Sequence, residues 1–436
     1  MMITAKDVAE GMIAEVPDRH LLRVARPVLF HSHMAPRNLR RVLLGIAMLA
    51  GADSLRSQVN EGAQSDEYRW TMRALEQYRS LAANDETSIL PSPKKPVEPG
   101  EHYAGIPRLT RLLSRVGDLP VGAFPTNSDL YDGEIVSAVR RFQSRHGLEP
   151  DGRIGKATFA QLNTPLSFRV RQLELALERW QRLSYDFSRP AVMLNLPEFR
   201  LRAFNAGHIP ELEMKIVIGR ARRLRTPLLV SEIDAVIFRP PWNVPLSIQR
   251  NELISDIMRD PSYISKNDFE LVTLQDVVVT EGTTSKLLAQ LRAGRLRLRQ
   301  RPGPKNALGL VKFVFPNEYN IYMHDTPAKS LFARARRDFS HGCIRLERAE
   351  DFAEWVLRKD TGWSKERIGA AMREGESITV QLKQSIPVTT MYVTAVVFGN
   401  GEVHFFEDIY GEDAALEKEL AEGRTTTDES GQRPRE

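Results

Sequence analysis

The chain has 436 residues, a length that usually holds about two to four domains. Its 42% apolar and 27% charged residues are typical of globular proteins, and no apolar run reaches the roughly 18 residues of a membrane-spanning helix, so wholesale disorder and an integral membrane bundle are both excluded. The net charge of +5 is spread along the chain, unlike the concentrated charge of most nucleic-acid-binding proteins, so no nucleic-acid partner is expected, and a mild basic excess suits an acidic polymer.

Residues 1–33 lack the periodic pattern of apolar residues that marks a core helix or strand. An export signal is predicted directly after them. Met34 opens a segment with three arginines, and the apolar run 42–52 follows and ends in Ala-Gly-Ala before Asp53. A basic start, an apolar stretch and a small-x-small site are the marks of a signal peptide. We therefore expect translation to begin at Met34 and the exported chain to begin near Asp53. The alternative is a short amphipathic helix in a cytosolic protein.

Residues 66–84 are predicted to form an amphipathic helix, because apolar side chains recur at three-to-four spacing. These side chains are Trp70, Leu75, Tyr78 and Leu81. Residues 88–100 then contain four prolines, which is typical of a linker.

A small helical module is predicted at residues 106–164. Its second helix has Asp132 as a candidate cap, and Gly147 suits the residue just beyond the helix end. A further helix is expected at 167–184, where apolar residues again line one side.

From Ala191 the pattern changes to strands. Two apolar runs flank Pro197-Glu198-Phe199 as in a hairpin, and further strands are expected at the positions given next. They are 214–219, 231–239, 310–315, 319–324 and three runs between 378 and 406, with helices at 247–259, 283–294, 350–358 and 364–373. The charged tail after Leu416 is predicted to be disordered.

The one cysteine of the chain lies in the run Ser340-His341-Gly342-Cys343. A single cysteine forms no internal disulfide, so it is either an inert core thiol or a nucleophile. His324 stands before it with fifteen residues between His324 and Ser340. A thiolate needs a nearby base or cation, and a glycine lets the chain turn and expose N–H groups to an oxyanion. The pattern therefore favours a nucleophile with a histidine base.

Two histidines compete as that base. His341 shares a strand face with Cys343 at the i, i+2 spacing, and His324 is the other candidate. A backbone carbonyl is the expected partner that orients His324, because the adjacent Asp325 points to the opposite face of a strand. Metal and nucleotide sites lack any supporting motif, so no metal and no cofactor are expected.

Residues 138–163 resemble the three-helix peptidoglycan-binding module found on many wall enzymes. Residues 191–373 resemble the L,D-transpeptidase catalytic domain, whose signature is a histidine, a spacer of comparable length and Ser/Thr-His-Gly-Cys. Further matches are Gly219-Arg220, Thr226-Pro227, Trp242-Asn243-Val244-Pro245, the run PKNALG at 304–309, YMHDTP at 322–327 and DIYG at 408–411. The chain is most similar to the large Gram-negative subtype, in which an insertion forms a lid over the active site.

The resemblance implies an α+β fold: a mainly-β catalytic domain with a helical lid insertion, a three-helix peptidoglycan-binding-like domain and a helical scaffold. The domain ranges that follow from it begin with an extension at 1–58, which contains the signal segment 34–52, and the scaffold and linker at 59–95. The module takes 96–166 and a connecting helix 167–190. The catalytic domain takes 191–376, with its lid at about 241–301, and is followed by closing strands at 377–412 and a disordered tail at 413–436.

The resemblance also implies the site and its chemistry. By matching positions, Cys343 is the nucleophile and His324 the proton donor and acceptor, with His341, Gly342 and Ser340 shaping the loop and the oxyanion site. Substrate contacts are expected from Arg345, Trp242, Asn306 and Tyr322. The expected reaction joins peptidoglycan stem peptides through a cysteine thioester in the periplasm, with release of D-Ala, and carbapenems are expected to acylate Cys343.

Two alternatives stay open from the sequence. Water instead of an amine as acceptor would make the protein an L,D-carboxypeptidase, and an inactive site would leave a wall-binding scaffold. Whether the helical module binds glycan also stays open, since such modules in large wall enzymes have in several cases lost their ligand groove.

Overall fold

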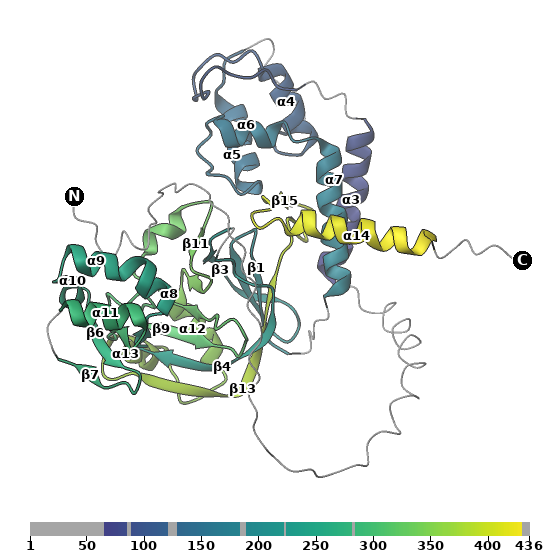
Figure 1. The fold of residues 1–436 in the computed structure, drawn as a ribbon. Coiled ribbons are helices and arrows are strands. Elements are labelled where there is room, and N and C mark those ends of the chain that lie inside the picture. Colours follow the sequence, from purple (N-terminus) through teal and green to yellow (C-terminus); the bar gives the residue numbers. More distant parts are fainter. Residues whose placement is uncertain are drawn as a thin grey trace, which may run out of the picture.

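The computed structural model describes residues 65–84, 89–120, 129–183, 189–221, 224–280 and 284–429, with the side chains of 424–429 excepted. The predicted export segment at 34–52 lies outside these residues. Figure 1 shows a β-rich domain that carries a lid on one side and a group of helices on the other.

The β-rich domain is built on a barrel. The strands run β3-β12-β10-β9-β4-β13-β1-β2, and β2 pairs back with β3 to close the ring, while β11 adds to the outer side of β3. Their bounds are β1 Ala191–Asn195, β2 Arg200–Phe204, β3 Pro210–Gly219, β4 Val230–Phe238, β9 Val311–Val314, β10 Met323–His324, β11 Asp338–Ser340, β12 Ile344–Leu346 and β13 Ile378–Met391. The mixed α+β class predicted from the sequence is confirmed.

Alternating apolar residues of these strands fill the barrel and pack against two helices, α12 (Ala349–Leu357) and α13 (Lys365–Arg373). Phe313 of β9 meets Phe352 of α12 edge-on, with ring centres 4.7 Å apart. The predicted hairpin after Ala191 is present as β1 and β2. The strand β13 pairs with both β1 and β4, so this C-terminal strand belongs to the barrel itself and not to a separate closing unit.

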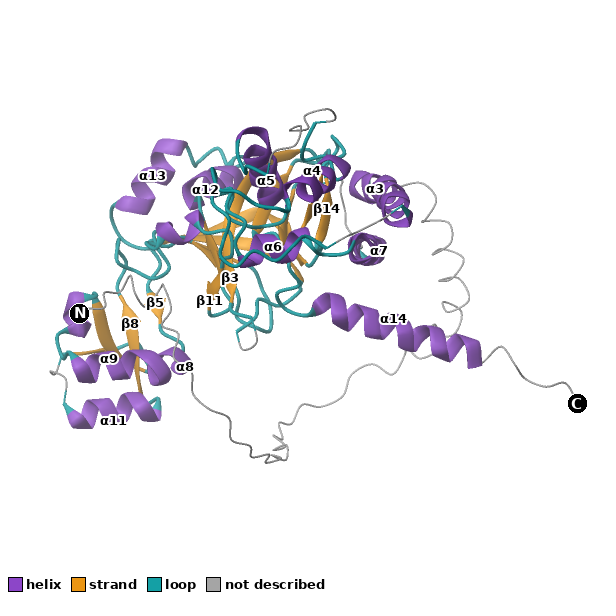
Figure 2. Ribbon diagram, turned by 90° about the horizontal axis from the view of Figure 1, so that it is seen from above, coloured by secondary structure: helices purple, strands orange, loops and turns teal. Residues whose placement is uncertain are grey.

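The lid, defined here as residues 241–301, contains a sheet as well as helices. Its strands are β5 Trp242–Asn243, β6 Phe269–Thr273, β7 Val278–Val279 and β8 Leu296–Gln300, and its helices are α8 Leu246–Ile248, the π-helical turn η1 Gln249–Leu253, α9 Ile254–Arg259, α10 Tyr263–Lys266 and α11 Ser285–Ala293. The lid therefore contains the helices expected from the sequence and, in addition, a sheet that was not expected. Figure 2 shows the lid as a separate layer beside the barrel.

The helical module consists of α4 (Ile106–Arg115), α5 (Gly133–Arg145) and α6 (Lys156–Leu162) around its own apolar core. Gly147 has a φ of 63°, the left-handed conformation expected just beyond a helix end. Asp132 occupies the cap position of α5, but its side chain makes no capping hydrogen bond.

The proline-rich stretch before the module is packed rather than loose. Leu90 and Val97 are both 4% exposed and belong to the module's core. Val97 also exchanges backbone hydrogen bonds with Ile154, and the hydroxyl of Tyr103 donates to the carbonyl of Pro91. The expectation of a free linker is therefore wrong for residues 89–100, because this segment completes the module.

The scaffold pairs α3 (Asp66–Ala83) with α7 (Leu166–Arg182) and a hairpin of β14 (Ala395–Val397) and β15 (Val403–Phe405). The described part of the tail forms helix α14 (Glu412–Glu429) across α7, so the expectation of disorder is wrong for 413–429, while 430–436 lie outside the described residues (Figure 1). Ion pairs with arginines of α7 hold it there: Arg179–Asp413, Arg171–Glu417 and Arg182–Glu419. None of the helices in the described residues has the length and apolarity needed to cross a bilayer.

Candidate active site

Two neighbouring barrel strands bring the signature residues together. Strand β10 ends at His324 and runs parallel to β12, with Met323 opposite Ile344 and His324 opposite Arg345. The loop that joins β11 to β12 carries His341, Gly342 and Cys343. His324 and Cys343 are therefore neighbours through strand pairing although their positions in the chain are far apart.

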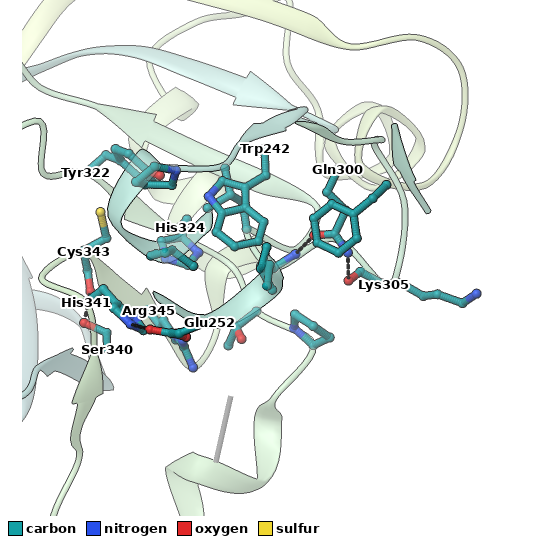
Figure 3. A pocket seen from close by; sticks show the side chains of 18 of the residues that line it. Trp242, Glu252, Gln300, Lys305, Tyr322, His324, Ser340, His341, Cys343 and Arg345 are labelled. Carbon is teal, nitrogen blue, oxygen red and sulfur yellow. Dashed lines mark hydrogen bonds and ion pairs between the residues drawn. The ribbon is translucent and has the colours of Figure 1, made fainter. Parts of the chain in front are cut away.

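A pocket between the lid and the barrel receives these side chains (Figure 3). Its barrel side includes Cys343, His324 and Arg345, and its lid side includes Trp242 and Glu252. A second pocket adjoins the first, and Cys343, Trp242 and Tyr322 line both. The thiol thus stands where two cavities meet.

Ser340 shapes the loop that carries the cysteine. Its hydroxyl donates to the carbonyl oxygen of Cys343 at 2.6 Å and accepts the N–H of Gly342 at 3.1 Å. Gly342 has a φ of 115°, a conformation that side-chain-bearing residues rarely adopt, and a Cβ there would lie 3.0 Å from Ile321. The Gly342 N–H is already bound to Ser340, so it is not a free oxyanion donor in this conformation.

A second set of residues holds the same loop from behind. The hydroxyl of Thr226 donates to the carbonyl of Gly342 at 2.7 Å and accepts the N–H of Gly219 at 2.9 Å. Tyr410 donates its hydroxyl proton to the carbonyl of Gly219 and accepts the N–H of Thr226. Three of the segments that matched the family in sequence, at 219, 226 and 408–411, therefore meet beneath the cysteine loop.

The ring of His324 is buried and neutral, with one nitrogen hydrogen-bonded and the other available to accept a proton. Its ring is 4% exposed, and Nδ1 is hydrogen-bonded to the carbonyl oxygen of Asp325. A carbonyl only accepts, so Nδ1 carries the proton and Nε2 keeps a lone pair. Burial, together with the charges of Arg345 and Lys312, lowers the pKa of His324 to about 3. The expected backbone orienter is present.

The carboxylate of Asp325 has a different task. It accepts a hydrogen bond of 2.9 Å from the N–H of Leu310, and it forms an ion pair with Lys329 at a distance of 2.7 Å. These bonds fix the loop before β9 and do not involve the ring of His324, as the alternation of side chains along a strand requires.

Cys343 is half-buried, and its sulfur lies 4.0 Å from the carbonyl oxygen of Asn320. Figure 3 shows the sulfur directed to the side of Tyr322 rather than toward the ring of His324. Burial raises the pKa of the Cys343 thiol, and the hydrogen bonds of Tyr322 and the charges of Lys312 and Arg345 offset this only in part. The resting pair is therefore a neutral thiol and a neutral imidazole.

His341 faces the lid. Its Nε2 lies 2.6 Å from a carboxylate oxygen of Glu252, and its side chain is 22% exposed. With Nε2 bound in this way, the ring of His341 is turned to the lid, whereas Nε2 of His324 keeps its lone pair. The geometry favours His324 over His341 as the base.

Arg345 carries a buried positive charge that is not neutralised by a carboxylate of the described residues. Its Nε and Nη1 atoms are buried without a hydrogen-bond partner, and the side chain lines the pocket. Burial and the charge of Arg220 lower its pKa to about 10. Burial of a guanidinium without hydrogen-bond partners costs folding free energy, and a carboxylate of a bound ligand would supply those partners.

The remaining predicted contacts divide into two groups. Trp242 and Tyr322 line the pockets. Asn306 is 1% exposed, and its amide is used up on the backbone: Nδ2 donates to the carbonyls of Pro240, Gln300 and Arg301, and Oδ1 accepts the N–H of Leu308. Asn306 therefore clasps the two ends of the lid, and the expectation that it contacts substrate is wrong.

Several residues at the site did not stand out in the sequence. Lys312 lies with its ammonium 3.8 Å from the ring centre of Tyr322, and Glu252 reaches His341 from the lid. In the described ranges, no group of three or more histidine, cysteine or acidic side chains is placed to hold a metal ion.

Comparisons with known proteins match two parts of the chain to known families. The family described as "L,D-transpeptidase catalytic domain" matches residues 189–373, and the family described as "Putative peptidoglycan binding domain" matches residues 104–162. A protein of Haemophilus influenzae named "Putative L,D-transpeptidase" is 32% identical over 225 residues. That match covers 52% of this chain but 45% of the relative, so the chain spans less than half of the relative's length.

Solved structures give weaker matches. An L,D-transpeptidase of Stackebrandtia nassauensis is 12% identical, with 69% of this chain and 97% of that chain covered and a TM-score of 0.27. L,D-transpeptidase 3 of Mycobacterium tuberculosis is 13% identical, with 46% and 61% covered and a TM-score of 0.22. The chain carries the catalytic domain of the L,D-transpeptidase family at residues 189–373, together with a peptidoglycan-binding domain at residues 104–162.

Proposed function

We propose that this protein cross-links peptidoglycan stem peptides outside the cytoplasm, in the periplasm, and that Cys343 forms the acyl-enzyme. The observation that carries this proposal is the place of Cys343 at the meeting point of two pockets, beside a neutral His324. One pocket suits a donor peptide and the other an acceptor amine. A lid over the thiol favours transfer to an amine over hydrolysis because it limits the access of water.

The first half-reaction transfers an acyl group to sulfur. The Cys343 thiol gives its proton to Nε2 of His324 as the sulfur attacks the carbonyl carbon that precedes D-Ala in a tetrapeptide stem. This step needs the thiol to rotate from the side of Tyr322 toward His324. The C–N bond then breaks, D-Ala leaves as an amine with the proton from His324, and a thioester remains on Cys343.

The second half-reaction reverses these roles. A diaminopimelate amine of a neighbouring stem attacks the thioester, and His324 takes its proton and returns it to the departing sulfur. Both oxyanions need N–H donors, and the loop of His341, Gly342 and Cys343 is the nearest source. Because the Gly342 N–H is bound to Ser340, the N–H groups of His341 and Cys343 are the better donors.

Substrate is held by charge and by ring faces in this proposal. Arg345 binds a carboxylate of the donor stem, since its guanidinium is buried without a protein partner. Trp242 and Tyr322 form the wall between the two pockets and contact the bound peptides.

The test incubates the full chain, and its Cys343→Ala variant, with purified disaccharide-tetrapeptide and follows the products by mass spectrometry. A cross-linked dimer that has lost one D-Ala, absent with the variant, is the expected result. Tripeptide alone would establish the carboxypeptidase alternative. If wild-type protein gives neither product and Cys343 stays unmodified by a carbapenem, the catalytic proposal is overturned and the wall-binding scaffold remains.

A further inference from the structure

Glu252 connects the lid to the catalytic loop. One of its carboxylate oxygens lies 2.6 Å from Nε2 of His341, and Figure 3 shows this contact at the floor of the pocket. In sequence the two residues are 89 positions apart. His341 stands between Ser340 and Gly342, within the loop that presents Cys343.

No second hydrogen bond of this kind is found in the parts of the lid that the structure describes, 241–280 and 284–301. In the described parts of the chain, the other hydrogen bonds that leave residues 241–301 go to the lid's own connection at 302–307, through Lys305, Asn306 and Ala307. Among the described residues, the Glu252–His341 bond is thus the one hydrogen bond that joins the lid to the catalytic loop.

The lid holds Glu252 in a fixed orientation. Glu252 lies in the π-helical turn η1, a rare geometry that is frequent at functional sites. Gln249 anchors this turn: it is fully buried, its Nε2 donates to the carbonyls of Leu291 and Leu296, and its Oε1 accepts the N–H of Leu298. The carboxylate is therefore presented by a rigid part of the lid.

Charge supports the same contact. Burial raises the pKa of Glu252, but the hydrogen bond and charge of His341, together with the charge of Arg220, outweigh it and leave the pKa below its usual value. The ionised carboxylate accepts a hydrogen bond from the Nε2–H group of His341, in a pocket lined by both the lid and the barrel.

We propose that Glu252 is a positioning residue: when the lid closes, its carboxylate fixes the ring of His341, and this completes the orientation of the loop from Ser340 to Cys343. The proposal rests on the proposed function for its kinetic consequences. Its physical content is that lid closure and assembly of the thiol site are one event. Bound substrate is then enclosed before the nucleophile reaches its reactive geometry.

The test is a double-mutant cycle with Glu252→Ala, His341→Ala and the double variant. Turnover of disaccharide-tetrapeptide gives kcat and KM, and alkylation of Cys343 by iodoacetamide gives a readout that needs no turnover. We expect E252A to lower kcat by roughly 10- to 100-fold with little change in KM, because a misplaced reactive loop costs about this much. The double variant should be no slower than H341A alone, since Glu252 acts through His341. Glu252→Gln keeps an oxygen that accepts from His341 and should restore most of the activity.

The matched control is Glu270→Gln. Glu270 also lies in the lid and pairs with Arg299 inside it, so this variant tests lid stability without touching the catalytic loop. It should leave kcat and the alkylation rate unchanged.

Three outcomes would overturn the proposal. Independent, multiplying effects of E252A and H341A would mean that Glu252 acts elsewhere, a rise in KM alone would make it a substrate contact, and wild-type behaviour of E252A would leave it without a role. If the wild-type protein gives no turnover, the proposed function fails, but the cycle of alkylation rates still decides whether Glu252 and His341 act as one unit.

Discussion

The hydroxyl of Thr226 donates a hydrogen bond of 2.7 Å to the carbonyl oxygen of Gly342, directly before the cysteine. Thr226 is 2% exposed, and its oxygen also accepts the N–H of Gly219 at the end of β3. One hydroxyl therefore bridges a barrel strand and the catalytic loop. Together with Ser340 on the other side, it fixes the sharp turn that Gly342 makes possible.

Replacement of Thr226 by valine removes this bridge while it keeps the shape of the side chain. The carbonyl of Gly342 and the N–H of Gly219 lose a buried partner, which costs about 1–3 kcal/mol of unfolding free energy. The loop shifts, and we expect kcat for cross-linking to fall roughly 10- to 100-fold. Thermal unfolding and steady-state kinetics measure the two effects.

Thr110→Val is the control for this change. Thr110 is also buried, and its hydroxyl donates within helix α4 to the carbonyl of Ile106, remote from the catalytic loop. Its replacement should leave kcat unchanged. Normal activity in T226V would mean that Ser340 holds the loop unaided.

The charge of Lys312 bears on the reactivity of the thiol. Its ammonium lies over the ring of Tyr322, whose hydroxyl interacts with Cys343, and its charge lowers the pKa of the thiol against the larger effect of burial. Lys312→Met should therefore raise the thiol pKa further and slow alkylation by iodoacetamide at pH 8 by up to roughly tenfold, the effect of one pKa unit.

The pH dependence of the alkylation rate measures this shift. In the wild type the rate should keep rising beyond pH 9, because the thiol pKa is raised from its ordinary value. Lys312→Arg keeps the charge and should follow the wild type closely. A rate profile of K312M that is the same as that of the wild type would contradict an electrostatic effect.

The chemistry of this site was predictable where it depends on short stretches of sequence. The nucleophile and its histidine stood out because the chain has one cysteine, in the run Ser340–Cys343, and His324 precedes that run by a short spacer. The pairing of β10 with β12 then brings the two residues together. Glu252 and Lys312 did not stand out, because each reaches the site through folding of a distant segment and each is an ordinary residue in its own sequence context. Thr226 was noted only as part of a matching pair, and its contact with the catalytic loop required the structure.

The errors in the fold have physical causes as well. The sequence analysis predicts no strand at Leu296–Gln300, directly after the helix expected at 283–294, yet this run forms β8. Its leucines face the lid core, while Arg299 pairs with Glu270 of β6 and Arg297 pairs with Asp276 in the turn after β6. Alternation of apolar and polar residues was the strand signal that could have identified it. Helix α14 has few apolar residues, and its acids find arginines of α7 more than 200 positions away.

Arg345 should distinguish substrates by their carboxylate. Arg345→Met keeps much of the side-chain volume and removes the cation whose Nε and Nη1 lack a protein partner. We expect the KM for a tetrapeptide with free carboxylates to rise by about tenfold or more, the effect of a lost charge-assisted hydrogen bond. Stem peptides with each carboxylate amidated in turn identify the group that is bound.

For the amide that removes the relevant carboxylate, wild type and R345M should have the same KM. If R345M instead lowers kcat with every peptide and leaves KM unchanged, Arg345 acts on the reaction through His324 or Cys343, and the carboxylate assignment is wrong.

His324 should make the protein less stable in acid. Its pKa is about 3 in the folded protein and near 6.5 in an unfolded chain, so between these values the unfolded state binds a proton that the folded state does not. Stability from this group is complete above about pH 6.5 and falls as the pH drops toward 3, by up to about 1.4 kcal/mol per pH unit. His324→Gln removes this dependence. Urea unfolding of both proteins from pH 4 to pH 8 therefore gives a difference that is constant near neutrality and shrinks in acid, where the wild type loses its advantage. Other titrating groups cancel in that difference, and a difference that stays constant down to pH 4 would mean that the pKa of His324 in the folded protein is close to its value in the unfolded chain, which would contradict the lowering of this pKa by burial.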